Sequence, residues 1–356
     1  MGVRLAAAWA LMVLNLAACY QPLRDVTFRA RVATVSTVGG AGLYGQPLGV
    51  AVDASGTVYV ATFSGNTILK FAPGATSPTT VAGTGSTTPA NQDSTNPLAA
   101  TFNNPRGVAV NGSGTIIDVA DETDQTIRTI TSAGVSTLAG TVENANSPPF
   151  FDNPVAIART SSGILYVADS QNFAIRKIES GTVTVLAGDP AMPGSSDSPA
   201  EFSGPSGLTV DASGNVYVTD SSTPTTASNN LIRKISPDGT VTTIAGIAGP
   251  SGSGFNDSTD PHQATFNLPS GIAVDGSGNI YIADSGNNVI RMIAPSGAVT
   301  TIAGSATEPG GSADGPGPLA RFNGPASLAI DSSGNLYVAD LNNASIRKIT
   351  FGPAQL

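Results

Sequence analysis

Two sets of residues in this sequence have types and spacings that bear on chemistry: a recurring aspartate–arginine pair and the few possible metal ligands or nucleophiles. An aspartate that ends a short apolar run is followed by an arginine, seven residues later in four copies and thirteen residues later in the fourth copy of the repeat, which has a six-residue insertion. The pairs are Asp121/Arg128, Asp169/Arg176, Asp220/Arg233, Asp284/Arg291 and Asp340/Arg347. A guanidinium can fork onto a carboxylate and neighbouring carbonyls. Because a single active site needs asymmetry, we interpret a pair repeated this often as structural rather than catalytic.

Residues that bind metals or act as catalytic bases are scarce. His262 is the only histidine, which excludes a multi-histidine zinc site and a credible Ser–His–Asp set. Cys19 is the only cysteine, so the chain has no internal disulfide and no spare thiol for catalysis. The net charge of −9 and the pI near 4.5 disfavour binding to nucleic acid. We therefore expect no cofactor and no nucleic-acid partner.

The elements that position the aspartate–arginine pairs are clearest between Pro269 and Gly304. Apolar residues alternate there with small or polar ones, and the gaps hold Gly, Asn, Asp, Ser and Pro, which is typical of strands and tight turns. The Asp-x-Ser-Gly-Asn turn is expected to be capped by its aspartate, with glycine supplying a positive φ. Four short strands are predicted, over residues 271–275, 279–284, 289–293 and 299–303.

This unit occurs six times along the chain, and each copy begins at a proline. The prolines are Pro47, Pro105, Pro154, Pro205, Pro269 and Pro325. Copies of this length with four strands each predict the blades of a β-propeller. The last copy lacks a fourth strand, whereas residues 33–40 match the fourth strands of the other copies. We expect this N-terminal strand to complete the last blade and close the ring, which leaves no open sheet edge between blades.

The repeated pattern, P-x-G-[VIL]-A-V-D-x-S-G-N-[IVL]-Y-V-A-D-x-x-N-x-x-I-R-K-I, resembles the NHL repeat over residues 33–351. The resemblance implies an all-β fold, a six-bladed β-propeller. The first copy departs from it with Thr62 and Leu69 in place of the Asp and the Arg, and the second has Asp124 instead of the usual Asn. Lactonase-like propellers hold calcium with acidic and amide side chains at the channel. Here the first strands begin with small or apolar residues and Arg106, which does not predict a carboxylate ring.

The first part of the chain has the pattern of an export signal. A short positive segment at Arg4 precedes an apolar core, so residues 1–18 are predicted to be a signal peptide. The sequence Leu-Ala-Ala-Cys ending at Cys19 resembles the lipobox of bacterial lipoproteins, which implies a lipid on Cys19 and a tether over residues 19–32. Tyr20, rather than Asp, favours the outer membrane in that family. The alternative is an ordinary signal peptide followed by an incidental cysteine.

The segments that precede each proline carry phenylalanines and acids. The phenylalanines, predicted to wedge between blades, are Phe102, Phe151, Phe202, Phe266 and Phe322. The acids are Asp93, Asp197, Asp257 and Asp314. We interpret the acids as loop caps, with a weak cation site around one face as the alternative.

These long segments and the turns between second and third strands emerge on one face of a propeller. Variable loops on a rigid scaffold are where recognition usually occurs. We therefore hypothesise that residues 33–356 form a monomeric, non-enzymatic propeller that binds a protein or a glycan through this long-loop face. A lipid on Cys19 would anchor the protein in the cell envelope at the outer membrane. The sequence does not distinguish the periplasmic side of that membrane from the cell surface. The alternatives are an extracytoplasmic hydrolase or lyase with an unrecognised metal site, and a scaffold role within a larger envelope complex.

Overall fold

The computed structural model describes residues 33–39, 45–86, 91–140, 151–190, 192–221 and 229–352. Residues 33–351 form one compact unit. The predicted signal peptide, the tether and Cys19 lie outside the described residues. Among the residues that are described, no helix has the length and apolar character needed to cross a membrane.

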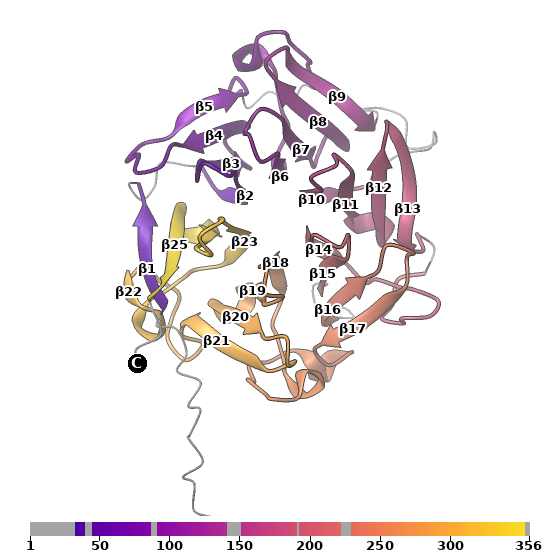
Figure 1. Ribbon diagram of the computed structural model, residues 1–356, viewed down its shortest axis with the longest axis vertical. Coiled ribbons are helices and arrows are strands. Elements are labelled where there is room, and N and C mark those ends of the chain that lie inside the picture. Colours follow the sequence, from indigo (N-terminus) through magenta and orange to yellow (C-terminus); the bar gives the residue numbers. More distant parts are fainter. Residues whose placement is uncertain are drawn as a thin grey trace, which may run out of the picture. The chain divides into compact units, whose positions relative to one another are not determined.

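Antiparallel sheets arranged around a central axis form a six-bladed β-propeller (Figure 1). The first five blades are β2–β5 (Pro47–Val52, Val58–Thr62, Thr67–Phe71, Thr79–Ala82), β6–β9 (Pro105–Val110, Ile117–Asp121, Thr126–Thr131, Gly134–Gly140), β10–β13 (Pro154–Arg159, Leu165–Asp169, Ala174–Glu179, Thr182–Gly188), β14–β17 (Pro205–Val210, Val216–Ser221, Asn230–Ile235, Val241–Ala245) and β18–β21 (Pro269–Val274, Ile280–Asp284, Val289–Ile293, Val299–Gly304). Every innermost strand begins at its predicted proline, which confirms the repeat.

Blade 6 combines the two ends of the unit. It contains β23 (Pro325–Ile330), β24 (Leu336–Asp340), β25 (Ser345–Phe351) and the N-terminal β1 (Ala33–Val38). Strands β1 and β25 pair antiparallel from Ala33↔Phe351 to Val38↔Ile346, and Figure 1 shows them side by side in indigo and yellow. The predicted ring closure is confirmed. A short strand that was not predicted, β22 (Gly315–Pro316), pairs with the outer edge of β1.

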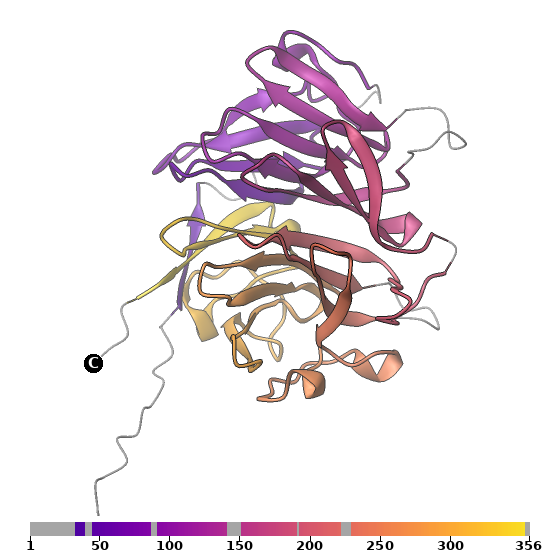
Figure 2. The ribbon, with the colours of Figure 1, turned by 45° about the vertical axis from the view of Figure 1, so that its right-hand side comes forward.

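Loops within blades and loops between blades contain short 3-10 helices (Figure 2). They are η1 (Pro97–Ala99), η2 (Ser170–Asn172), η3 (Pro250–Gly252), η4 (Pro261–Gln263), η5 (Ser285–Asn287), η6 (Gly317–Leu319) and η7 (Leu341–Asn343). Helices η2, η5 and η7 directly follow the second strands of their blades, so the residue after each strand-ending aspartate begins a tight turn.

The core consists of apolar layers between neighbouring blades. Phe102, for example, packs among Ala61 and Ile68 of blade 1 and Val119 and Ile130 of blade 2. The other predicted wedges, Phe151, Phe202, Phe266 and Phe322, lie in the equivalent layers between later blades. All five rings are buried, which confirms the prediction that they wedge between blades.

Near the axis, the innermost strands of blades 1, 2, 4 and 5 approach the next blade too closely for a side chain at the glycine of the P-x-G pattern. A Cβ atom on Gly207 would lie 1.9 Å from the carbonyl oxygen of Ser270, and one on Gly49 would lie 2.1 Å from that of Arg106. The glycine in the P-x-G pattern therefore reflects contact between blades, because no real Cβ tolerates such distances.

Candidate binding site at the mouth of the central channel

The recurring aspartates and arginines lie inside the blades. The Asp and Arg side chains are 0% exposed in blades 2, 4, 5 and 6, whereas Arg176 in blade 3 is 12% exposed. The closest nitrogen–oxygen distances are 3.3 Å for Arg128–Asp121, 2.8 Å for Arg176–Asp169, 3.3 Å for Arg233–Asp220, 3.0 Å for Arg291–Asp284 and 2.8 Å for Arg347–Asp340. Their burial removes them from contact with a solvent-borne ligand.

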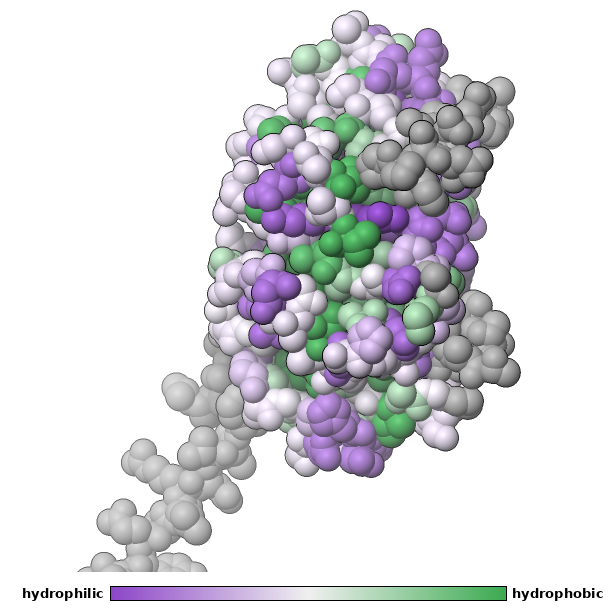
Figure 3. Space-filling view, turned by 90° about the vertical axis from the view of Figure 1, so that its right-hand side faces the viewer, coloured by the Kyte–Doolittle hydropathy of each residue, from purple (hydrophilic) through white to green (hydrophobic). Residues whose placement is uncertain are grey.

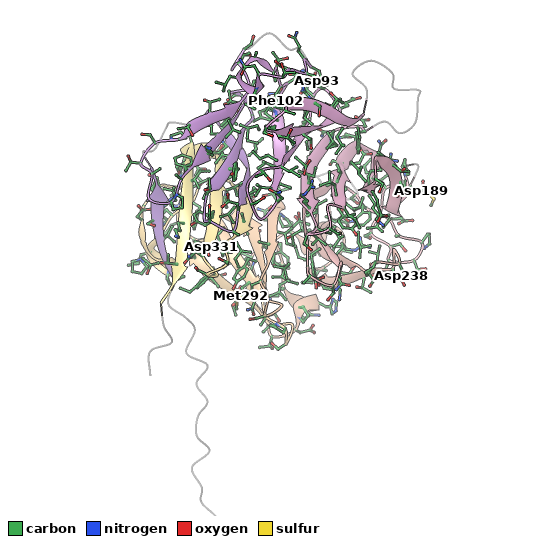
Figure 4. The ribbon with its side chains drawn as sticks, turned by 45° about the horizontal axis from the view of Figure 1, so that its top comes forward. Asp93, Phe102, Asp189, Asp238, Met292 and Asp331 are labelled. Atoms are coloured by element: carbon green, nitrogen blue, oxygen red, sulfur yellow. The ribbon has the colours of Figure 1, made fainter. Side chains whose placement is uncertain are left out.

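The loop acids bind the same arginines from the other side. In blade 2, Arg128 Nη2 lies 2.7 Å from Asp93, and its Nη1 donates to the carbonyl of Thr101 at 2.9 Å. The guanidinium also lies 5.1 Å from the ring centroid of Phe102, which Figure 4 shows near Asp93 at the outer part of this blade. The other oxygen of Asp93 accepts from the backbone N–H of Thr137 at 2.9 Å. The arginine thus ties the preceding loop to its blade.

The same arrangement recurs in blades 4, 5 and 6, where the loop acids are Asp197, Asp257 and Asp314. Each of these acids also accepts a hydrogen bond from the backbone of the outermost strand, at Thr243, Thr301 and Thr37 respectively. This geometry agrees with the interpretation of these acids as loop caps. In blade 3, Val185 stands where the others have threonine.

The two groups of carboxyls have opposite electrostatic environments. Burial raises the pKa of Asp121 to about 7 and that of Asp284 to about 6, against hydrogen bonds that lower both. For the loop acids Asp93 and Asp197, partial burial is outweighed by hydrogen bonds from the threonine backbone and the arginine, so the pKa is lowered. Asp93 and Asp197 are therefore ionised at neutral pH and hold their arginines in place.

A cavity of about 330 Å³ runs along the axis, lined by five residues from each innermost strand. Its only charged lining side chains, among the described residues, are Arg106 and Arg159. Arg106 stands near the start of β6 and Arg159 at the end of β10, so they lie at opposite ends of the channel. Within the described part of the chain, no group of three or more His, Cys, Asp or Glu side chains could hold a metal ion.

The mouth of the channel on the long-loop face is asymmetric. The second residue of each innermost strand lines the channel at this end. The residue after the final Asp of the second strand, or after Thr62 in blade 1, lies at the same end of the blade, because that Asp or Thr pairs with the proline that begins the innermost strand. From blade 1 to blade 6 the pairs are Leu48/Phe63, Arg106/Glu122, Val155/Ser170, Ser206/Ser221, Ser270/Ser285 and Ala326/Leu341. Blades 6 and 1 are apolar here, blade 2 is ionic, and blades 4 and 5 carry hydroxyls. The repeated scaffold thus supports one non-repeating surface.

Side-chain contacts link the polar pairs of this mouth. Arg106 Nη1 lies 3.3 Å from Glu122, and their side chains are 31% and 15% exposed. The Ser206 and Ser221 hydroxyls are 3.1 Å apart, and Ser221 Oγ donates to the carbonyl of Pro269 at 2.8 Å. Sequence analysis identified Arg106 but missed Glu122 and Ser221. The signal for Glu122 was its place directly after a repeated aspartate, where the other copies with this aspartate have Ser or Leu.

The opposite mouth has a buried ion pair that sequence analysis also missed. Arg159 Nη1 lies 2.5 Å from Asp118, which is fully buried and also accepts from the hydroxyl of Thr129. Asp118 occupies the position of a tyrosine that in other blades donates to a turn aspartate, as Tyr217 does to Asp211 at 3.1 Å. The sequence feature that could have predicted this pair is the second strand of blade 2, I-D-V-A-D, which has Asp118 where the second strands of the other blades have tyrosine.

The outer rim has a separate apolar surface. Leu138 on β9 is 39% exposed and Val185 on β13 is 46% exposed. Figure 3 faces this side of the ring and shows apolar groups between polar ones. This surface lies at the outermost strands and is distinct from the channel mouth.

The geometry of the blades agrees with a sequence-family comparison. The profile of the NHL repeat matches residues 202–224, 266–291 and 322–349, which lie in blades 4, 5 and 6 and the segments before them. The chain contains NHL repeats. Mouse teneurin-4 is 31% identical over 225 residues, which is 55% of this chain and 8% of teneurin-4. Human NHL repeat-containing protein 3 is 30% identical over 112 residues, 32% of this chain and 28% of that protein.

Solved structures share this fold. A Bacteroides thetaiotaomicron protein of unknown function has a TM-score of 0.67 and 21% identity, covering 89% of this chain and 76% of its own. An auxiliary nutrient binding protein from the same organism has a TM-score of 0.63 and 14% identity, covering 90% and 77%. Streptogramin B lyase has a TM-score of 0.56 and 14% identity, covering 91% and 99%. At these identities the likeness concerns the fold.

Proposed function

We propose that this NHL propeller is an exported, lipid-anchored binding module that takes a protein or glycan ligand through its long-loop face. The observation that carries the proposal is the asymmetric channel mouth. Five blades repeat the same buried Asp–Arg pair, whereas the residue pairs at the mouth are apolar in blades 6 and 1, ionic in blade 2 and hydroxyl-bearing in blades 4 and 5. A single ligand needs such a non-repeating surface, with apolar contacts on one side and a few polar groups that fix orientation.

The anchoring of the loops supports recognition by a rigid surface. In blades 2, 4, 5 and 6 the loop before the blade is held by a buried arginine and a buried phenylalanine. A surface ordered before binding loses less conformational entropy when the ligand arrives. The shared fold with an auxiliary nutrient binding protein favours a binding role, and the shared fold with a lyase keeps the enzyme alternative as an outcome to test.

A photo-crosslinking amino acid at position 48 tests the site. Leu48 and Val52 lie at opposite ends of β2, so the same probe at position 52 is the matched control. We expect the full chain in intact cells to form a ligand adduct from position 48 and not from position 52. The adduct should be lost when Arg106→Glu is added, because the mouth then carries two facing carboxylates. Equal adducts from both positions, or a stoichiometric metal that survives dialysis of the purified protein, would contradict the binding-module proposal.

Membrane attachment depends on Cys19 in this proposal. Cys19→Ala is expected to move the protein from the membrane fraction to the soluble fraction, since no thiol then remains to carry a lipid. Cell fractionation with immunoblotting measures the distribution, and Arg31→Ala within the predicted tether is the control that should remain membrane-bound. If the Cys19→Ala protein stays in the membrane fraction, the lipoprotein assignment is wrong.

A further inference from the structure

The turn after the second strand normally contains an asparagine that donates to the strand-ending aspartate. Asn172 Nδ2 lies 2.9 Å from Asp169 in blade 3. The equivalent amides in blades 5 and 6, Asn287 and Asn343, lie 2.8 Å from their aspartates. In these blades an amide hydrogen therefore occupies the space between the two side chains.

Blade 2 has Asp124 in this place, three residues after Asp121. The next residue, Gln125, has φ 56°, matching the left-handed residues Phe173 and Asn288 that follow the asparagines of blades 3 and 5. Asp124 is only 6% exposed. Its Oδ1 accepts from Asn103 Nδ2 at 2.9 Å, while its Oδ2 has no hydrogen-bond partner among the described residues. The turn is thus conserved within the molecule, but its donor has been replaced by an acceptor.

The charges around Asp121 do not neutralise a second carboxylate. Asp121 accepts from the backbone of Asn103 at 2.8 Å and lies 3.3 Å from Arg128, which is also bound to Asp93. The neighbouring charged groups have other partners: Glu122 pairs with Arg106 and Asp118 with Arg159. Two buried carboxylates that share one arginine with a third acid cannot all ionise without a large electrostatic penalty.

We propose that Asp121 and Asp124 share one proton, which takes the place of the asparagine amide hydrogen of the other blades. The carboxylic acid then donates to the neighbouring carboxylate as the amide does elsewhere. When the proton is lost, two facing acceptors remain in the core of blade 2. The pair therefore makes the stability of blade 2 depend on pH in a way that the Asp–Asn pairs of the other blades do not.

The expected pH dependence follows from the electrostatics of the pair. Burial, together with the charge of Asp124, raises the pKa of Asp121 to about 7 despite the lowering by the Asn103 N–H group. An aspartate in an unfolded chain has a pKa of about 3.9. The folded state therefore holds an extra proton between these values, so the stability contributed by the pair falls as the pH rises from about 4 to about 7 and stays lost above.

Asp124→Asn tests the proposal, because it restores the amide donor of the other blades. We expect the melting temperature of this variant to equal that of the wild type at about pH 5. At about pH 8 it should exceed the wild-type value by roughly 2–6 °C. Because Asp169, Asp220, Asp284 and Asp340 also have raised pKa values, the difference between the two proteins at each pH isolates the pair. Melting curves of the full chain across this range, in EDTA, measure the difference.

Asn172→Asp in blade 3 is the matched control, since it creates an Asp169/Asp172 pair and should add the same pH-dependent loss. Infrared difference spectra should also show a protonated carboxyl band in the wild type that disappears in Asp124→Asn, and this readout does not depend on the folding of the blade 3 variant. A melting difference that is constant with pH would overturn the shared proton. A difference that vanishes when calcium replaces EDTA would also overturn it, because a cation would then occupy the pair.

Discussion

Arg291→Met is expected to lower the free energy of unfolding by about 3–5 kcal/mol, because it leaves a buried carboxylate without its counter-charge. The side chains of Arg291 and Asp284 are both 0% exposed and lie 3.0 Å apart. Arg291 also bonds Asp257 and the carbonyl of Thr265, so its loss frees the preceding loop from the blade. Methionine keeps the apolar stem, which limits the cavity and isolates the loss of charge and hydrogen bonds. Chemical denaturation at neutral pH measures the change.

Arg176→Met is the matched control in blade 3. Arg176 is 12% exposed, and Val185 replaces the threonine that elsewhere binds the loop acid. We expect a smaller loss, about 1–3 kcal/mol, because water reaches part of the site. Equal losses in the two blades would contradict the dependence of the loss on how deeply the arginine is buried.

Val35→Asp is expected to cost about 4 kcal/mol or more, because it places an unpaired charge in the layer that joins the last blade to blade 5. Val35 is 1% exposed and packs in one cluster with residues of both blades, among them Ile290 and Ile349. Strand β1 belongs to blade 6 only through pairing and packing, so this substitution acts directly on the closure of the ring. Denaturation and proteolysis from the N-terminal side measure the loss.

Ser36→Asp is the control on the same strand. Ser36 is exposed and its register partner is Lys348, so a carboxylate there meets water and a positive charge. Its effect should be within about 0.5 kcal/mol of zero. If both substitutions destabilised the protein equally, the strand itself would be intolerant of charge, and burial of Val35 would not explain the result.

The blades and their closure could be predicted from sequence because their signals are local. Alternating apolar residues mark each strand, Asp-x-Ser-Gly-Asn marks the first hairpin of blades 4, 5 and 6, and the strand at 33–38 carries the pattern missing after Phe351. In the folded chain the Asp275 carboxylate accepts from the backbone of Ser277 and Asn279 at 2.9 and 2.8 Å, as a capped turn requires. The short sequence of this turn is therefore enough to predict its hydrogen bonds.

The candidate site could be predicted only in part, because its contacts join residues far apart in sequence. Asp93 was recognised as a loop acid, but its bond to Arg128 depends on the path of the loop back over the blade. Glu122 follows a repeated aspartate, and no local pattern predicts its ion pair with Arg106, which forms because β6 places Arg106 beside it. Strand β22 was missed because two residues, Gly315 and Pro316, carry no strand periodicity.

The pairing of Ala33 with Phe351 has a mechanical consequence. The first and last residues of the ring are neighbours in an antiparallel ladder, so both ends of the propeller leave from one corner of blade 6. A force that pulls residues 33 and 351 apart would break the β1–β25 pairing one residue pair at a time. A force on residue 33 that is opposed by a ligand bound elsewhere on the ring would instead act along the strands and load all the residue pairs in shear. A lipid at Cys19 would transmit the second kind of force. With the proposed lipid on Cys19, the orientation of the β1–β25 pair would resist traction from the membrane.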